Sequence, residues 1–358
     1  MKNKPIPILT PVAIAVASIT DAAYAAKPHG ISLGGFIDAY IAYDVNNPSN
    51  LDRSFTTQPA RHNEFNINLA YLEAKLEREK VHGRLALQAG TSVQSNYASE
   101  PTVGSVSGPN LSRHLQEAFV GYRLGDATWI DAGIMLSHIG VESFISKDNL
   151  LYTRSLVADF SPYYETGVRL SHSFNDQLSA QLLVLNGWQI ISENNQNKAL
   201  GTQLSYSFNP KLTLIYNTFF GRESSFRHFH DLILKFTPDE AWSFAAQADI
   251  GFQDEAPGGQ NASWNGFSVM AKRSISQMFA ITSRVERYTD PKQVLIASSY
   301  GHAFQSWGAS LGLDANLDSN IWWRNEVRGY FSDQAIFPSD NGFKTTDGVI
   351  VSSISAAF

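Results

Sequence analysis

Nine histidines and no cysteine set the first limits on the chemistry of this 358-residue chain. Without cysteine, disulfides, thiol catalysis and cysteine-bound zinc are excluded. The best local group of metal ligands is His228, His230 and Asp231. Residues two apart on a strand face the same side, so both imidazoles could point together. No further residue is spaced nearby to join the two imidazoles as a third or fourth ligand. This favours solvated histidines at a loop end over a metal site.

Other combinations of reactive residues are weaker. A lipid-cleaving Ser–His pair would need both residues on adjacent strands, and His172 and Ser283 fall on distant predicted strands. The acidic and amide runs at 193–197 and 254–255 could touch calcium, but exposed loop tips of this kind are typically solvated. The sequence therefore predicts no catalytic residue, no metal site and no cofactor.

The charged residues carry more information, because they recur on one side of an alternating pattern. Near the bilayer midplane a lipid-facing Lys or Arg costs about 2–4 kcal/mol, so charges gathered on one parity predict a water-filled interior. The alternative is that these charges pair with each other and plug a closed barrel; a barrel of 16–18 strands normally leaves an aqueous channel, which favours the channel. The candidate lining residues are Asp38, Arg84, Arg113, Glu117, Arg123, Asp131, Glu165, Arg169, Asp231, Lys235, Asp249, Lys272, Arg284, Glu286, Arg324, Glu326 and Arg328.

The elements that position these charges are strands. Stretches of about ten residues alternate in hydropathy along the whole chain, and period two with one apolar face is typical of a strand. In the stretch from Phe65 the apolar parity switches, which predicts a bulge near Tyr71. About sixteen such stretches fit the chain. No run approaches the length of apolar sequence that a spanning helix needs.

The breaks between the stretches alternate between short and long. Short breaks include 125–127, 175–177 and 209–211, and they are predicted to be periplasmic turns. Long extracellular loops are predicted at 46–63, 96–112, 137–161, 189–198, 288–302 and 332–345. The sequence therefore predicts an all-β fold, a transmembrane antiparallel up-and-down β-barrel of about 16 strands.

Aromatic residues support a membrane barrel over a soluble sandwich. They end the apolar face near the short turns and again near the long loops, as two girdles would. These residues are Phe208, Phe236, Trp242, Phe279 and Phe358 on one side, and Tyr43, Phe220, Phe252 and Phe331 on the other. The terminal aromatic Phe358 is the predicted signal for the barrel assembly machinery.

The first residues read as an export signal. Lys2 and Lys4 precede a mostly apolar stretch, and Ala23-Tyr24-Ala25 offers a small-x-small cleavage site. A buried N-terminal helix is the alternative, which two prolines in the stretch disfavour. We expect residues 1–25 to be a signal peptide, residues 26–358 to be the barrel, and the location to be the outer membrane of a Gram-negative bacterium.

Several strings carry a family resemblance over roughly residues 31–223. They are FIDAYIAYD (36–44), FNINLAYLEAKLE (65–77), LQEAFVGYRLG (115–125), DAGIMLSHIGVES (131–143), ETGVRLSHSF (165–174) and LVLNGWQ (183–189). They resemble the OmpL-like putative beta-barrel porin family; Ser137 departs from the Thr expected there. The resemblance implies a porin-type barrel and carries over no catalytic residue and no substrate.

The predicted function is passive diffusion of small hydrophilic solutes, without catalysis. The loop at 137–161 is expected to fold inward and narrow the pore through Glu142, Lys147, Asp148, Arg154 and Asp159, the alternative being a loop that lies over the rim. Arg169 and Arg324 are expected to bias a weakly selective pore towards anions, unless each is tied to a carboxylate and only braces the wall.

The expected partners are outer-membrane lipid, small solutes and the barrel assembly machinery. Sixteen-stranded porins often form trimers, so a homotrimer is a candidate assembly. The net charge of −6 argues against nucleic acid. The competing function is a structural or adhesive barrel that acts through its extracellular loops.

Overall fold

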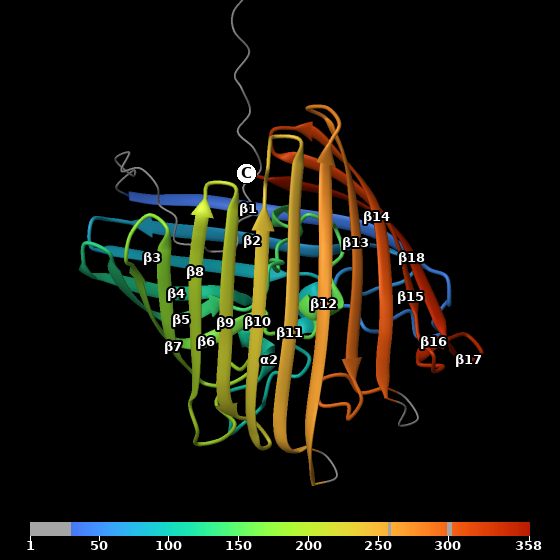
Figure 1. Cartoon of the computed structure of the whole chain (residues 1–358), viewed down its shortest axis with the longest axis horizontal. Helices are drawn as coiled ribbons and strands as arrows, with labels where there is room; N and C mark the ends of the chain where they lie inside the picture. Colours follow the sequence, from blue (N-terminus) through green and yellow to red (C-terminus); the bar gives the residue numbers. More distant parts are fainter. Residues whose placement is uncertain (1–29, 257–258, 299–302) are drawn as a thin grey trace, which may run out of the picture.

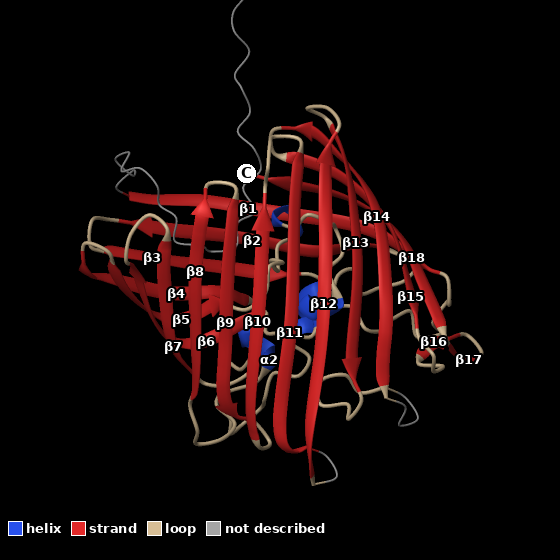
Figure 2. Ribbon diagram, in the orientation of Figure 1, coloured by secondary structure: helices blue, strands red, loops and turns tan. Residues whose placement is uncertain are grey.

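The chain folds into a closed antiparallel barrel. The computed structural model describes residues 30–256, 259–298 and 303–358. In it, sixteen strands form one sheet in which sequence neighbours pair and β18 closes the ring against β1 (Figures 1 and 2). The predicted fold class and strand number are thereby confirmed. The predicted signal peptide, residues 1–25, lies outside the described residues.

The bounds of the elements follow the predicted stretches closely. The barrel strands are β1 (Gly30–Asp44), β2 (Phe65–Glu77), β3 (Val81–Ala89), β4 (Leu115–Gly125), β5 (Thr128–Leu136), β6 (Tyr164–Ser173), β7 (Leu178–Leu185), β8 (Ala199–Asn209), β9 (Leu212–Arg222), β10 (Phe226–Phe236), β11 (Trp242–Ala256), β12 (Gln260–Ser274), β13 (Phe279–Asp290), β14 (Phe304–Asp318), β15 (Ile321–Phe331) and β18 (Thr346–Ala357). The smaller elements are the hairpin β16 (Phe337–Ser339) and β17 (Gly342–Lys344), the helices α1 (Thr91–Asn96), α2 (Pro109–Ser112) and α3 (Leu156–Asp159), and the 3₁₀ turn η1 (Ser146–Asp148). In the described part of the chain no helix is long and apolar enough to cross a membrane.

Alternation sets which side chains face out. On β1, Ile31, Leu33 and Ile37 are exposed on the outer surface, whereas Phe36 and Asp38 are buried inside. An apolar outer face and a polar inner face are what a barrel in a bilayer requires, because lipid cannot solvate charge.

The bulge in β2 lies at Asn68, not near Tyr71 as the sequence predicted. Asp38 pairs with Leu69 and the next residue of β1 pairs with Ile67, so Asn68 is the extra residue. Its side-chain amide donates to Oδ2 of Asp38 at 2.8 Å, which holds the kink from inside. Leu69 consequently turns inward and is fully buried, although the alternation had placed it on the outer face.

The two ends of the barrel differ in their connections. Long links follow β1, β3, β5, β7, β13 and β15, all at one end. At that same end the β9–β10 and β11–β12 connections contain few residues, so the lengths of the links at this rim are uneven. The opposite end carries the short turns together with Gly30 and Phe358, the first and last described residues.

The long link between β5 and β6, residues 137–163 and here called the inner loop, enters the barrel. Its helix α3 lies against β11, β12 and β13. Leu156 and Val157 are fully buried and pack with Phe229, Trp264 and Tyr288 of the wall. Burial of these apolar side chains holds the loop inside the ring of strands.

Candidate functional site: the loop-lined barrel interior

Wall carboxylates receive the backbone N–H groups of the inner loop. Glu326 on β15 accepts from the Thr153 backbone nitrogen at 2.8 Å and from its hydroxyl at 2.7 Å. Glu286 on β13 accepts from the Leu156 nitrogen at 2.6 Å. All these groups are buried, so each bond satisfies a backbone donor that would otherwise lack a partner.

Guanidinium groups of the wall donate hydrogen bonds to the carbonyl oxygens of the same loop. Arg324 on β15 donates to the carbonyl oxygens of Ser146 at 2.7 Å, Leu150 at 2.9 Å and Asn149 at 3.2 Å. Its Nε also bonds Asp314 at 3.0 Å, and only 3% of its side chain is exposed. Arg324 therefore acts as a clamp between the wall and the loop.

A buried ion network continues this clamp along β13 and β15. Arg284 donates to the Thr153 carbonyl at 2.7 Å and pairs with Glu142 of the loop at 3.4 Å. Arg328 pairs with Glu286 at 2.6 Å. Burial raises the pKa of Glu142 above its usual value, and Arg284 offsets part of that rise.

The loop also reaches the wall near β1. Ser146 Oγ donates to Asp38 Oδ2 at 2.8 Å, and the Tyr152 hydroxyl donates to Asp38 Oδ1 at 3.2 Å. Further along, the Tyr163 hydroxyl donates to Asp159 Oδ1 at 2.6 Å. The contacts with β1, β13 and β15 thus anchor the tip of the loop to the wall.

The base of the loop is fixed by a buried histidine. His138 Nδ1 lies 2.9 Å from both Glu165 oxygens, and its Nε2 lies 3.0 Å from the Thr218 carbonyl oxygen. Burial lowers the pKa of His138, but the Glu165 carboxylate outweighs it and leaves the pKa raised. Nearby, the Gly140 nitrogen donates to Asp231 at 2.8 Å.

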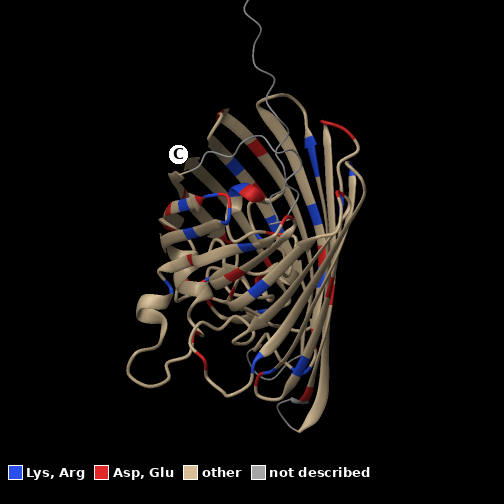
Figure 3. Cartoon of the chain, turned by 90° about the vertical axis from the view of Figure 1, so that its left-hand side faces the viewer, with Lys and Arg blue, Asp and Glu red and all other residues tan. Residues whose placement is uncertain are grey.

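On its other side the inner loop leaves a cavity of about 510 Å³ against β2 to β6. Figure 3 shows basic and acidic residues distributed along the strands and the loops of the barrel. The charged residues that line the cavity are Glu73, Lys75, Arg84, Glu117, Glu142, Lys147, Asp148, Arg154 and Arg169.

Arg84 and Arg169 of the cavity wall are paired but remain partly exposed. Arg84 pairs with Glu73 at 2.6 Å and also with Glu117, and Arg169 pairs with Asp131 at 2.8 Å. The Arg84 side chain is 15% exposed and the Arg169 side chain is 16% exposed. Partial exposure lets these guanidinium groups act on a solute in the cavity, which the buried Arg324 does not face.

The candidate lining residues therefore divide into three groups. Arg84, Glu117 and Arg169 line the cavity, as do Glu142, Lys147, Asp148 and Arg154 of the loop. Arg123, Lys235 and Lys272 are partly exposed on the inward parity. Asp131 and Asp249 belong to the buried group that follows. Asp38, Glu165, Asp231, Arg284, Glu286, Arg324, Glu326 and Arg328 face the interior but are buried, and Asp159 of the loop is buried with them.

Two expectations need correction. Arg113 is not on the wall, because β4 begins only at Leu115; its guanidinium bonds Gln94 and Asn110 within the preceding link. Arg324 does not face open space, because the loop carbonyls cover it. It is tied to a carboxylate, as the bracing alternative required.

Glu73 and Lys75 are cavity residues that the sequence reasoning missed. Both alternate with Leu72 and Ala74, which face outward, so the parity after the bulge was the available signal.

Phe358 ends the chain on the outer surface. Its backbone pairs with Gly35 at 2.9 and 3.1 Å, and 65% of the residue is exposed. A Cβ at Gly35 would overlap the Phe358 ring, so only glycine lets the ring pack there.

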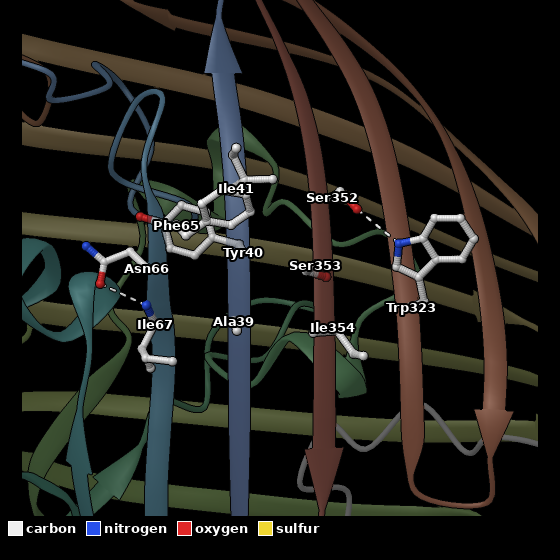
Figure 4. Close-up of a pocket in the computed structure, with 10 residues that line it drawn as sticks. All are labelled: Ala39, Tyr40, Ile41, Phe65, Asn66, Ile67, Trp323, Ser352, Ser353 and Ile354. Carbon is white, nitrogen blue, oxygen red and sulfur yellow. Dashed lines mark hydrogen bonds between the residues drawn. The ribbon is translucent and has the colours of Figure 1, made fainter.

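A shallow groove of about 580 Å³ crosses the outer face over β2, β1, β18 and β15 (Figure 4). Phe65 and Trp323 flank it, with Ala39 and Ile354 between them. The one polar contact drawn across strands joins the Trp323 indole nitrogen to Ser352 Oγ at 3.0 Å. This groove faces the lipid side and is separate from the inner cavity.

Comparisons with known proteins agree on the fold. Pseudomonas putida OprB matches with a TM-score of 0.60 and 10% identity, over 92% of this chain and 94% of that one. Vibrio cholerae OmpT matches with a TM-score of 0.58 and 7% identity, over 93% of this chain and 99% of that one. An anion-selective porin from Comamonas acidovorans matches with a TM-score of 0.56 and 10% identity, over 92% of this chain and 99% of that one. At these identities the likeness shows the fold alone.

Among curated protein sequences none matches the chain significantly. A family model, in contrast, matches residues 30–358, which includes every strand described above. This family match supports an outer-membrane location. The chain belongs to the family described as putative beta-barrel porin-2, OmpL-like.

Proposed function

We propose that this protein is a passive diffusion channel for small hydrophilic solutes. The observation that carries the proposal is the charged cavity between the inner loop and the β2–β6 wall. Buried charges on β13 and β15 hold the loop inside the barrel, and the charged cavity remains between the loop and the β2–β6 wall. Solutes would move past the loop along this wall.

The expected ion selectivity is weak. Five basic residues (Lys75, Arg84, Lys147, Arg154, Arg169) face four acidic ones (Glu73, Glu117, Glu142, Asp148) around the cavity. Opposite charges so close together offset each other, and salt screens the remainder over about 8–10 Å. The slight basic excess favours anions.

Single-channel recording in a planar bilayer tests the proposal. The purified protein should give stepwise conductance, and deleting residues 145–151 should raise each step because that segment narrows the pore. A matched control removes residues 104–106 from the exposed tip of another loop, where Val106 is 99% exposed, and should leave the steps unchanged.

Folding of both variants is checked by heat-modifiable migration. Equal conductance in a folded variant lacking residues 145–151 would refute the constriction. Absence of any conductance in the wild type would instead favour a structural or adhesive barrel that acts through its long loops.

We further propose a homotrimer, exported through a signal peptide cleaved after Ala25 and inserted by the barrel assembly machinery in a Gram-negative outer membrane. One support is the Vibrio cholerae OmpT structure described as a trimer form, which matches with a TM-score of 0.55 and 7% identity. Sedimentation of the detergent-solubilised protein, together with N-terminal sequencing of the mature chain, tests both statements. A monomer, or a chain that still begins at Met1, would contradict them.

A further inference from the structure

Two histidines stand apart from the pore on the outer surface of β10. His228 and His230 share the outward parity of Leu232 and Leu234 and are partly exposed. They lie near Phe226, where β10 begins, at the end of the barrel that bears the long loops. Because Asp231 points inward to the loop, it takes no part in this outer pair.

The two rings are placed for a shared ligand. His228 Nδ1 lies 3.4 Å from His230 Nε2. Two nitrogens bound to one zinc ion at 2.0–2.1 Å with a tetrahedral angle lie about 3.4 Å apart. The separation between the two imidazole nitrogens therefore already equals that of two neighbouring ligands on a tetrahedral metal.

A neighbouring hydroxyl is compatible with the tautomer that a metal would need. The Tyr216 hydroxyl lies 2.7 Å from His230 Nδ1. If Nδ1–H donates to this hydroxyl, the lone pair of His230 is on Nε2, the nitrogen that faces His228. A hydrogen bond to the second ring nitrogen is the usual way in which proteins orient a metal-binding histidine.

Aromatic side chains hold the other ring. His228 stacks on Phe252 with ring centroids 4.7 Å apart and an interplanar angle of 13°, and it is nearly parallel to Phe220 at 6.4 Å. These contacts come from β9 and β11, which flank β10 (Figure 1). Rings already fixed in the free protein lose little rotamer freedom on binding.

The ligand set determines the class of metal. Among the described residues no group of three or more His, Cys, Asp or Glu side chains could hold an ion. The site would thus supply two imidazoles and leave the other positions to water. Imidazole suits zinc, copper and nickel, whereas calcium and magnesium prefer oxygen ligands.

We propose that His228 and His230 form a two-histidine site for a borderline divalent metal ion such as Zn²⁺ or Cu²⁺ on the outer rim of the barrel, with Tyr216 as a positioning residue. The site lies on the outer surface of the wall, away from the cavity, so it is independent of the proposed channel function. The sequence alone favoured solvated histidines, because spacing cannot show that the two rings meet.

The test is an isothermal titration calorimetry experiment in which ZnCl₂ or CuCl₂ is added to the untagged mature protein in detergent. One ion should bind at about pH 7.5, and its affinity should fall as the pH is lowered to about 5.5, because protons compete with the metal for the imidazole nitrogens. Copper should give an electron paramagnetic resonance spectrum with two nitrogen ligands. His228→Ala and His230→Ala should each abolish this binding, and Tyr216→Phe should weaken it by about 10–100-fold.

His172→Ala is the matched control. His172 also faces outward, and its Nδ1 lies 2.8 Å from the Thr128 hydroxyl, far from β10 in the ring. This variant should bind zinc as the wild type does. Undiminished binding in folded His228→Ala would overturn the site, and undiminished binding in Tyr216→Phe would overturn the positioning role.

Discussion

Replacement of Arg324 by Gln separates the two roles that an interior arginine can have. In the wild type its guanidinium donates to three carbonyls of the inner loop, at Ser146, Asn149 and Leu150, and pairs with Asp314. Gln can replace at most part of this set. Asp314 keeps Lys272 as a partner at 2.9 Å, so the main loss falls on the loop.

The size of the loss follows from burial. Hydrogen bonds from a charged donor contribute about 1.5–3 kcal/mol each, and removing one partner from a buried ion pair costs about 3–5 kcal/mol. Because contacts of one side chain are not additive, we take about 3–5 kcal/mol as the weakening of loop attachment. The population of the detached loop should then rise by roughly 10² to 10³·⁵.

The assay is single-channel recording with a salt gradient. Arg324→Gln should add larger, noisier conductance levels as the loop detaches, while the reversal potential changes little because Arg324 does not line the cavity. Arg169→Gln is the matched comparison: it lines the cavity, and its hydrogen bonds go to Asp131 of the wall. It should shift the reversal potential towards cations and leave the conductance levels steady.

The opposite pattern would refute this reasoning. If folded Arg324→Gln shifts the reversal potential as far as Arg169→Gln, with wild-type conductance levels, the guanidinium is reached by permeating ions and the loop does not cover it.

Three further outcomes are expected. Deleting Phe358 should lower the amount of heat-modifiable barrel in the outer membrane, as immunoblotting can show; unchanged amounts would remove its role in assembly. Glu165 raises the pKa of His138 above 6.5, so the pair stabilises the fold fully below pH 6.5 and loses that effect as the pH rises through the raised pKa. The denaturant concentration at the unfolding midpoint should therefore fall at alkaline pH, and His138→Gln should make that fall smaller. Single cysteines at Asp176 and Lys292, both exposed, should react with an impermeant maleimide on intact cells only at position 292; labelling at 176 alone would reverse the topology.

The strand pattern was predictable because lipid enforces it residue by residue. A charge on the outer face costs free energy at its own position, so the parity of Glu117 or Arg169 can be read without knowledge of the rest of the fold. The sequence could predict that β2 contains a bulge, but not at which residue. Its position at Asn68 depends on a hydrogen bond to Asp38, which lies thirty residues away in the chain.

The path of the inner loop sets the limit of the sequence reasoning. No periodicity marks where an irregular segment runs, so parity alone cannot separate Arg169, which lines the cavity, from Arg324, which the loop covers. The distinction depends on the carbonyl groups of residues 146–150, and a backbone carbonyl leaves no trace in the residue types.

The irregular backbone of the inner loop also explains why so many charges line this barrel. A loop inside a barrel must satisfy its N–H and C=O groups without strand neighbours. Glu286 and Glu326 take N–H groups, while Arg284 and Arg324 take carbonyls, and the same charges neutralise one another across β13 and β15. The arc from β10 to β1 thus uses its charges to hold the loop. On the β2–β6 arc Arg84 and Arg169 remain partly exposed, so their substitution should change selectivity, whereas substitution of the buried Arg284 or Arg324 should change stability and noise.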